Sequence, residues 1–150
     1  MSTPDHSHSD PALWDRVQRS FDRQGLMAHW GARLLKVRSG QVEIELPYSD
    51  RITQQQGGFH GGAIGALADI TAGYAALTVA SPELEVTTIE YKINFLAAFQ
   101  GGTLLARGEV VRAGRRVIVA GARVVHIGEQ GAESDCALMQ ATFAPIPKTY

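Results

Sequence analysis

Residues 60–80 constrain the fold more than any other part of the chain. Their sequence, HGGAIGALADITAGYAALTVA, consists almost entirely of small and apolar residues, and Asp69 is its only charged residue. A helix at the surface of a globular protein shows a polar stripe with a period of 3.6 residues. This stretch shows none, so a helix here must be buried on all sides, either by a membrane or by a surrounding shell of protein.

Two features favour the protein shell. About 20 apolar residues suffice to cross a bilayer, but Asp69 would lie near the bilayer centre, and no aromatic or basic belt flanks the stretch. Glycine in a helix costs up to about 1 kcal/mol relative to alanine, which indicates that another element packs very close to this helix backbone. The glycines are Gly61, Gly62, Gly65 and Gly73. We therefore expect a curved sheet wrapped around one central helix.

The rest of the chain supplies the strands of such a sheet. Residues 41–47 alternate apolar and charged side chains, which predicts a half-buried strand, and they form a hairpin with residues 28–38 around Ser39-Gly40. Residues 48–59 form a polar connection to the helix. Four β-rich runs with short separators follow the helix and predict an antiparallel meander: 86–98, 103–112, 116–127 and 132–144. The expected class is α+β, with about six strands around one helix.

A peripheral helix is expected near the N-terminus. Asp10 has the form of an N-cap and is followed by Pro11 at the first helical position, and apolar residues then recur at helical spacing to about residue 24. Gly25 would end this helix at the C′ position. Residues 1–10 are polar and lack the apolar core of a secretory signal, so we expect a disordered tail there and a single domain over residues 11–150.

Composition excludes several classes of function. The formal net charge is −1, so no strong field favours nucleic acid or an anionic membrane. Cys136 is the only cysteine, which rules out an intrachain disulfide and fits the reducing cytoplasm. No group of His, Cys and Asp residues has the spacing of a zinc site, and we expect no metal.

The glycine-rich start of the central helix is the first candidate site. Residues 57–62 read GGFHGG, so the first turn has backbone N–H groups that no side chain covers. The positive end of the helix dipole adds to them, and together they suit a carbonyl oxygen that becomes an oxyanion, or a phosphate. A tight turn explains the same glycines equally well. The stretch is not a P-loop, because no Gly-Lys-Ser/Thr follows.

Asp69 is the second candidate. A carboxylate in an apolar helix is costly unless it is functional, or is held by a backbone amide or a neighbouring arginine. Asp69 lies eight residues after Gly61, a rise of about 12 Å. One reacting carbonyl cannot contact both groups, so if both act on one substrate, the carboxylate comes from a second copy of the chain. This predicts a symmetric dimer with its sites across the interface.

These residues also carry a resemblance to a known family. The pattern Gln54-x-x-Gly57-x-x-His60-Gly61-Gly62-x-x-x-x-Leu67-x-Asp69 resembles the helix motif of the hotdog-fold acyl-CoA thioesterases. More narrowly, it is similar to the His-Gly-Gly branch, which includes the phenylacetate-pathway and 4-hydroxybenzoyl-CoA thioesterases. The resemblance extends over residues 30–145, and it implies the hotdog fold.

The resemblance implies roles for individual residues near the helix. Gly61 would donate its N–H to the thioester carbonyl, with Gly57 and Gly62 beside it in the substrate site. Asp69 would act as general base on water or as nucleophile. His60 would orient the neighbouring loop.

Further positions carry over from the same resemblance. Gln54 would lie near the thioester or the attacking water, although relatives pair Asn with Asp or Gln with Glu, and this chain mixes the two. Either Thr88 or Thr87 would supply a hydroxyl that positions water. Gly114, Arg115 and Arg116 would meet the coenzyme A nucleotide, or they form a plain hairpin turn with solvated arginines.

The function that follows is hydrolysis of an aryl- or medium-chain acyl-CoA to a free acid and coenzyme A. No cofactor is needed, because coenzyme A is part of the substrate. We expect a homodimer as the minimum active unit, assembled into a homotetramer, in the cytoplasm. The alternatives are a non-catalytic acyl-CoA-binding sensor or scaffold and, further off, a hydratase or dehydratase on the same fold.

Overall fold

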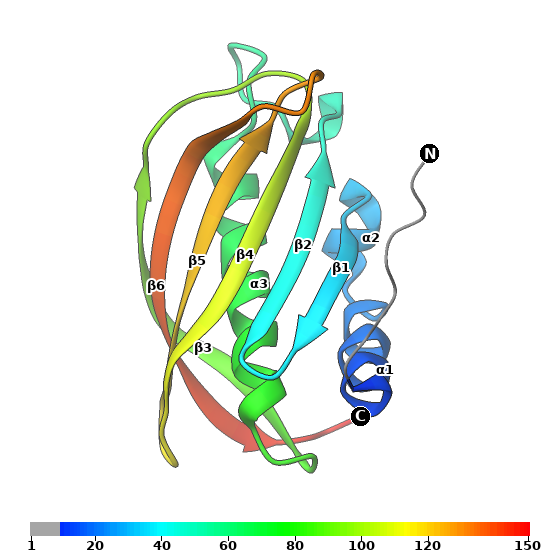
Figure 1. Ribbon diagram of the computed structural model, residues 1–150, viewed down its shortest axis with the longest axis vertical. Helices are drawn as coiled ribbons and strands as arrows, with labels where there is room; N and C mark the ends of the chain where they lie inside the picture. The colour runs from blue at the N-terminus through cyan, green and yellow to red at the C-terminus, as the bar shows by residue number, and fades with distance from the viewer. Residues whose placement is uncertain (1–9) are drawn as a thin grey trace.

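A long central helix lies in the curve of one antiparallel sheet (Figure 1). The computed structural model describes residues 10–150, and residues 1–9, where most of the expected tail falls, lie outside the described residues. The elements in chain order are α1 (Pro11–Phe21), α2 (Gly25–Trp30), β1 (Arg33–Arg38), β2 (Gln41–Pro47), η1 (Asp50–Ile52), α3 (Gly61–Val79), β3 (Leu84–Phe95), β4 (Thr103–Ala113), β5 (Ile118–Ile127) and β6 (Glu133–Pro147). Over the described residues, the strand order is β1-β2-β4-β5-β6-β3, which confirms a curved sheet of six strands around one helix.

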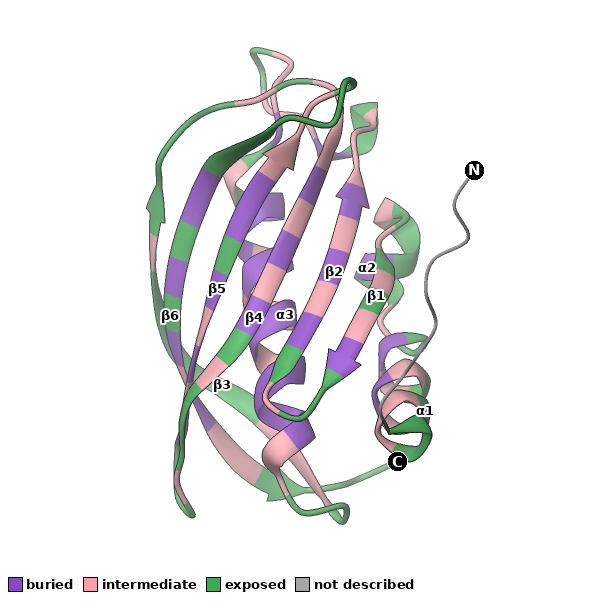
Figure 2. Ribbon diagram, viewed as in Figure 1, coloured by how far each residue is buried: buried purple, intermediate pink, exposed green. Residues whose placement is uncertain are grey.

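Helix α3 begins and ends within one residue of the expected bounds, but it is not buried on every side. Most of its side chains are buried against the sheet, while Ala66, Asp69, Ile70 and Gly73 are only half-buried (Figure 2). Its length and hydropathy would suit a membrane span, yet two-thirds of that stretch is buried inside the protein. These half-buried residues form the side of α3 that faces β3, and space remains beside the helix there.

Strand β3 is placed differently from the expected meander. It pairs with β6 at the edge of the sheet, and β4 pairs with β2 and β5 in the middle. The connection from α3 to β3 is short, so β3 must run back beside the helix it has just left. The loop over residues 96–102 then crosses the end of the sheet to reach β4 (Figure 1). The hairpin of β1 and β2 and the meander of β4, β5 and β6 follow the prediction.

The N-terminal region contains a second helix that the sequence analysis missed. Asp10 caps α1 as expected, since its carboxylate accepts from the Leu13 N–H at 3.1 Å. However, α1 ends at Phe21, and Gly25 begins α2 instead of ending α1. Residues 28–30 are therefore helical, not part of a strand. Helix α2 places Met27 fully in the core, and Gly31, with φ of 73°, ends it.

Helix α1 is fastened to the end of α3 by one arginine. The Arg16 guanidinium donates to the carbonyl oxygens of Leu77, Ala80, Ser81 and Leu84 at 2.9–3.1 Å. The last carbonyls of a helix lack partners within it, and a cation there also suits the helix dipole. Arg16 therefore satisfies the carboxyl end of α3 and holds α1 against it.

We predict that Arg16→Met lowers the free energy of unfolding by about 2–3 kcal/mol, because it leaves part-buried carbonyl groups without a charged donor. Urea unfolding at equilibrium measures the change. Arg19→Met is the matched control, since Arg19 bonds to the Asp15 carbonyl of its own helix and to no other residue in the described part of the chain. Equal stability of the two variants would contradict this role of Arg16.

Candidate active site

The first turn of α3 has one free backbone donor. His60 is the N-cap, and its Nδ1 accepts from the Gly62 N–H at 2.7 Å. A Cβ at Gly62 would lie 3.0 Å from the same nitrogen, so glycine there admits the imidazole. Among residues 10–150, no acceptor pairs with the Gly61 N–H. His60 therefore pairs with the Gly62 N–H, and the Gly61 N–H is left without a partner among the described residues.

Gly61 lines a shallow cavity of about 320 Å³. Gln54, Ile64 and residues 95–98 line it together with Gly61. The Gln54 Oε1 accepts from the Gln56 N–H, which fixes the amide group above the turn. The Gln54 Nε2 has no acceptor within the described part of the chain, so it is available to a ligand. The structure therefore brings Gln54 and Gly61 together, as expected.

Gly57 and His60 shape this region without lining the cavity. Gly57 takes φ of 88°, which favours glycine, and its carbonyl accepts from the Tyr48 hydroxyl at 2.6 Å. The His60 N–H donates to the Ile52 carbonyl at 2.8 Å. Both residues hold the loop that leads into α3.

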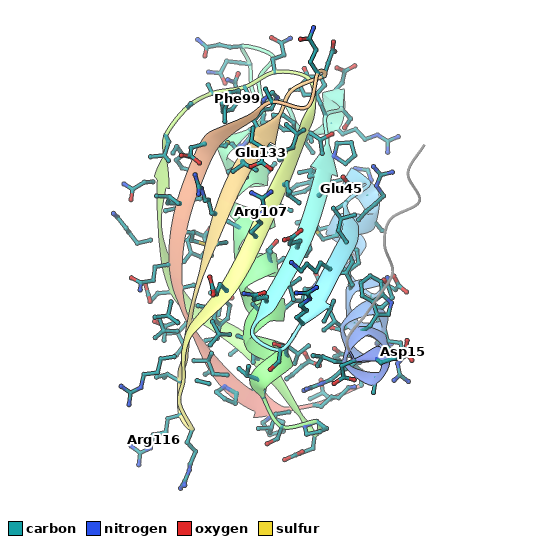
Figure 3. The ribbon with its side chains drawn as sticks, in the orientation of Figure 1. Asp15, Glu45, Phe99, Arg107, Arg116 and Glu133 are labelled. Atoms are coloured by element: carbon teal, nitrogen blue, oxygen red, sulfur yellow. The ribbon has the colours of Figure 1, made fainter. Side chains whose placement is uncertain are left out.

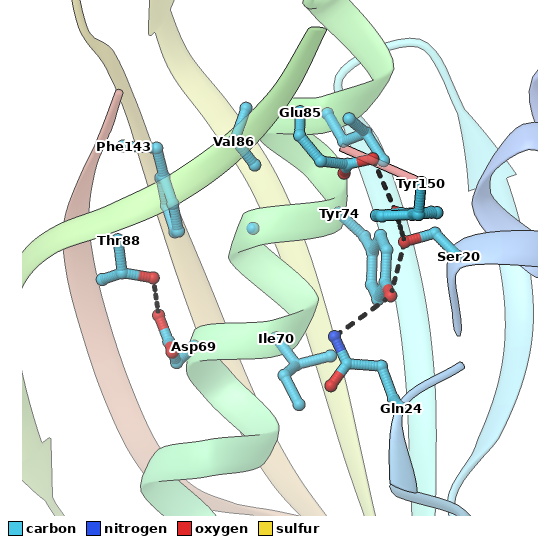
Figure 4. A pocket seen from close by; sticks show the side chains of 12 residues that line it. Ser20, Gln24, Asp69, Ile70, Tyr74, Glu85, Val86, Thr88, Phe143 and Tyr150 are labelled. Atoms are coloured by element: carbon cyan, nitrogen blue, oxygen red, sulfur yellow. Dashed lines mark hydrogen bonds between the residues drawn. The ribbon is translucent and has the colours of Figure 1, made fainter. Parts of the chain in front are cut away.

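Asp69 lies in the middle of α3 with a hydroxyl partner on β3. The Thr88 Oγ1 donates to Asp69 Oδ1 at 2.8 Å, so Thr88, not Thr87, faces the carboxylate (Figure 4). Asp69 forms no ion pair with any described cation, which removes the arginine-bound alternative. Burial raises the pKa of the Asp69 carboxyl above its ordinary value, and the Thr88 hydrogen bond offsets part of that rise.

A second cavity, of about 270 Å³, opens beside Asp69. Its walls come from α3, β3 and β6, but also from α1 and from the last residue of the chain (Figure 4). The polar residues among these that the sequence analysis missed are Ser20, Gln24, Tyr74, Glu85 and Tyr150. One signal pointed to them: Tyr74 is the only aromatic residue of the central helix, and a buried tyrosine hydroxyl needs a partner.

Gly61 and Asp69 line separate cavities of the protomer. Strand β3 runs beside α3 in the opposite direction, so that Gly61 lies next to Phe95, while Asp69 lies next to Thr88. The rise of about 12 Å between them is that of a regular helix. The two groups cannot act on one carbonyl within a single chain, and their joint action through a second copy stays a prediction.

Gly114, Arg115 and Arg116 lie away from both cavities. They form the exposed tip of the β4–β5 hairpin, where the Gly114 N–H donates to the Val117 carbonyl at 2.9 Å, and Arg116 projects outward (Figure 3). Neither arginine forms an ion pair with a described residue. Their contact with a nucleotide stays a prediction. Over residues 10–150, no three His, Cys, Asp or Glu side chains converge on a possible metal position.

Comparisons with known proteins agree with this geometry. The family model of the thioesterase superfamily matches residues 56–133. A candidate esterase of Saccharolobus solfataricus is 39% identical over 87 residues, which are 58% of this chain and 61% of that protein. The 1,4-dihydroxy-2-naphthoyl-CoA hydrolase of Listeria monocytogenes is 29% identical over 61% of this chain and 74% of its own. The crystal structure of a thioesterase family protein from Silicibacter pomeroyi is 37% identical, with a TM-score of 0.87 over 91% of this chain and 99% of that one.

The raised pKa of Asp69 predicts a pH-dependent effect on stability. The native state holds this proton more tightly than the unfolded state, so the group's contribution to stability is complete below the ordinary aspartate pKa and is lost as pH rises through the raised pKa. Asp69→Asn keeps an oxygen that accepts from Thr88. It should therefore raise the urea midpoint at pH 7, and the gain should vanish below about pH 4.

The control for this measurement is Asp135→Asn, which removes an exposed carboxylate that pairs with Arg123. It should give no gain at pH 7. A gain for Asp69→Asn that is the same at both pH values would contradict the assignment to the raised pKa.

Proposed function

This chain belongs to the thioesterase superfamily, and we propose that it hydrolyses an acyl-CoA with an aryl or medium-chain acyl group. The half-apolar cavity beside Asp69 supports a compact acyl group. The name of the Listeria relative, a hydrolase of an aryl-CoA, points the same way. The free thiol of Cys136 is consistent with a reaction in the cytoplasm, and hydrolysis as written below needs only water besides the thioester.

The observation that carries this proposal is the half-buried carboxylate of Asp69, which lines a cavity, accepts from the Thr88 hydroxyl and pairs with no cation among residues 10–150. A carboxylate with a raised pKa is a better general base near neutral pH than an ordinary one. In the proposed reaction, Asp69 takes a proton from water while the water oxygen attacks the thioester carbonyl, or the carboxylate itself attacks that carbon. Thr88 keeps the carboxylate in place in either route.

The second part of the proposed site is the free N–H of Gly61. It donates to the carbonyl oxygen as that oxygen becomes an oxyanion, and the positive end of the α3 dipole adds to the stabilisation. Gln54 holds its free amide N–H beside the same point. When water attacks, the tetrahedral intermediate expels the coenzyme A thiolate, which takes up the proton, and the free acid remains. When the Asp69 carboxylate attacks, loss of the thiolate leaves an anhydride between the acyl group and Asp69, and water then hydrolyses this anhydride to the free acid and the Asp69 carboxylate.

We further propose that the site forms between two copies joined along β3. This strand is an exposed edge along most of its length, and Ile89 and Phe95 are 55% and 54% exposed. An uncovered apolar edge strand is a template for pairing with another strand. A two-fold axis between Tyr91 and Lys92 would bring the Phe95 end of one strand opposite Thr88 of the other. The free N–H of Gly61 in one copy would then lie near Asp69 in its partner.

Removal of the Asp69 carboxylate tests the proposed chemistry. In a thiol-release assay on a panel of aryl- and alkyl-CoA thioesters, Asp69→Ala should lower turnover by at least about 100-fold, as expected for a base or nucleophile. Asp135→Asn should keep wild-type turnover. Near-normal turnover by Asp69→Ala would overturn the role of Asp69, and binding without turnover by the wild type would indicate an acyl-CoA sensor.

Proline at position 61 removes the proposed oxyanion donor with little change to the fold. Proline is well tolerated at the first position of a helix, and His60, with φ of −68° and ψ of 134°, has the extended conformation that must precede it. Gly61→Pro should lower turnover by about 100-fold and leave the urea midpoint unchanged.

Gly61→Ala is the matched variant, because it keeps the N–H and its Cβ would meet Phe95 at an ordinary 3.4 Å. It should retain most of the wild-type turnover. Equal turnover by the two variants would show that the Gly61 N–H does not act on the substrate.

A further inference from the structure

Three residues of α3 form a single stripe that faces β3. Gly61, Gly65 and Asp69 are spaced four residues apart, so they lie on the same side of the helix, each about one turn after the last. At one end of the stripe, a Cβ at Gly61 would lie 3.4 Å from the ring of Phe95. At the other end, the Thr88 hydroxyl donates to Asp69 (Figure 4). Gly65 therefore lies midway between the proposed oxyanion donor and the proposed base.

Tyr91 of β3 reaches the middle of this stripe. A Cβ at Gly65 would lie 3.4 Å from the Tyr91 hydroxyl oxygen, which places the hydroxyl close to the backbone of α3. The Tyr91 side chain is 43% exposed, so water and ligands can reach it. Its hydroxyl forms no hydrogen bond with any other residue in the described part of the chain. A polar group without a partner thus lies between the two reacting ends of the stripe.

A β-bulge turns both hydroxyl groups of this part of β3 toward the helix. Successive side chains of a strand point to opposite faces of the sheet, so Thr88 and Tyr91, three residues apart, would face opposite sides in a regular strand. The pairing of β3 with β6 shifts its register between Thr88 and Glu90. The extra residue of this bulge moves Tyr91 to the same face as Thr88, and bulges commonly re-aim a side chain next to an active site.

The spacing between the Tyr91 hydroxyl and the Asp69 carboxylate matches one water molecule. Cβ positions four residues apart on a helix are separated by about 5–6 Å. The Asp69 side chain leans toward the start of α3, and hence toward Gly65 and the hydroxyl beside it. The two groups form no direct hydrogen bond with each other. A water that bonds to both oxygens separates them by about 5–6 Å, since each such bond is about 2.8 Å long.

Both oxygens are able to accept a hydrogen bond from such a water. Thr88 bonds to the Oδ1 of Asp69 and leaves Oδ2 without a partner among residues 10–150. The Tyr91 oxygen keeps its accepting lone pairs, since no described residue donates to it. A water that directs its two protons at these acceptors has its own lone pairs free, and one of them can attack a carbonyl carbon.

We propose that Tyr91 is a further catalytic residue, and that its hydroxyl and the Asp69 carboxylate hold the attacking water between them. The inference rests on the proposed hydrolysis and selects the route in which water attacks. One water proton passes to Asp69 as the water oxygen bonds to the thioester carbon, and the other proton stays on that oxygen, hydrogen-bonded to Tyr91. The carbon–sulfur bond then breaks, the coenzyme A thiolate takes the proton from Asp69, and the free acid keeps the water oxygen. Tyr91 stays protonated throughout.

Loss of the Tyr91 hydroxyl tests this role. In the thiol-release assay, on the thioester that the wild type hydrolyses fastest, Tyr91→Phe should lower kcat by about 10-fold and leave KM nearly unchanged, because the lost bond acts on the water and not on the bound thioester. The urea midpoint and the oligomeric state should stay the same, since the hydroxyl has no partner in the described chain. Thr142→Val is the matched control. It removes a hydroxyl that donates to Glu90 on the face of the sheet away from α3, and it should keep the wild-type kcat.

A double variant shows whether Tyr91 and Asp69 act on the same water. In Asp69→Asn the water has lost its base, so adding Tyr91→Phe should lower the residual kcat by less than about 2-fold. A further loss as large as that in the wild-type background would show that Tyr91 acts independently and would overturn the inference.

Two other results would also overturn it while the proposed hydrolysis stands. One is a wild-type kcat in Tyr91→Phe, and the other is a loss of kcat that comes with a changed oligomeric state. If the wild type releases no thiol from any thioester of the panel, the proposed function itself fails, and the role of Tyr91 with it.

Discussion

The backbones of α3 and β4 touch, and the rest of the structure depends on that contact. A Cβ at Gly108 would lie 2.5 Å from the Thr71 carbonyl oxygen, so no other residue fits at this position of β4 without moving the helix. On the helix side, the alanines and glycines of α3 have side chains small enough to allow this close approach. Because the helix lies so deep in the curve of the sheet, its position and rotation are tightly fixed. As a result, Asp69 faces β3, and the first turn of α3 is held in the position where Gly61 lines a cavity.

The sequence predicted those parts of the structure that local patterns determine. The bounds of α3, the Asp10 cap and the β1–β2 hairpin follow from spacing along the chain. The resemblance left Thr87 and Thr88 as alternatives, and the hydrogen bond from Thr88 to Asp69 was seen only in the structure. The sequence did not predict that β3 leaves its sequence neighbour and pairs with β6, since that choice depends on how the sheet closes around the helix. Helix α2 was missed for a related reason, because six residues with one core side chain, Met27, show no clear period.

The candidate site was likewise predicted only in part from the sequence. Gly61, Gln54 and Asp69 belong to one short motif and were predicted from it. The cavity beside Asp69 is lined in part by Ser20, Glu85 and Tyr150, which are far apart in the sequence, and only the folded chain shows their contact. Helix α1 therefore has two tasks. Arg16 holds it to the end of α3, and one turn later Ser20 lines the cavity beside Asp69, so the packing of α1 affects both the stability of the protein and the shape of that cavity.

The central claim is that each site takes Asp69 from one chain and Gly61 from another, and mixed dimers test it most directly. Asp69→Asn and Gly61→Pro chains, each of which should have little activity alone, are unfolded together and refolded in equal amounts. Random pairing gives one intact site in each mixed dimer, so thioester hydrolysis should return to about one quarter of the wild-type turnover per chain. If mixed dimers form and turnover stays at the level of the two inactive parents, Asp69 and Gly61 do not meet across the interface, and the account is wrong.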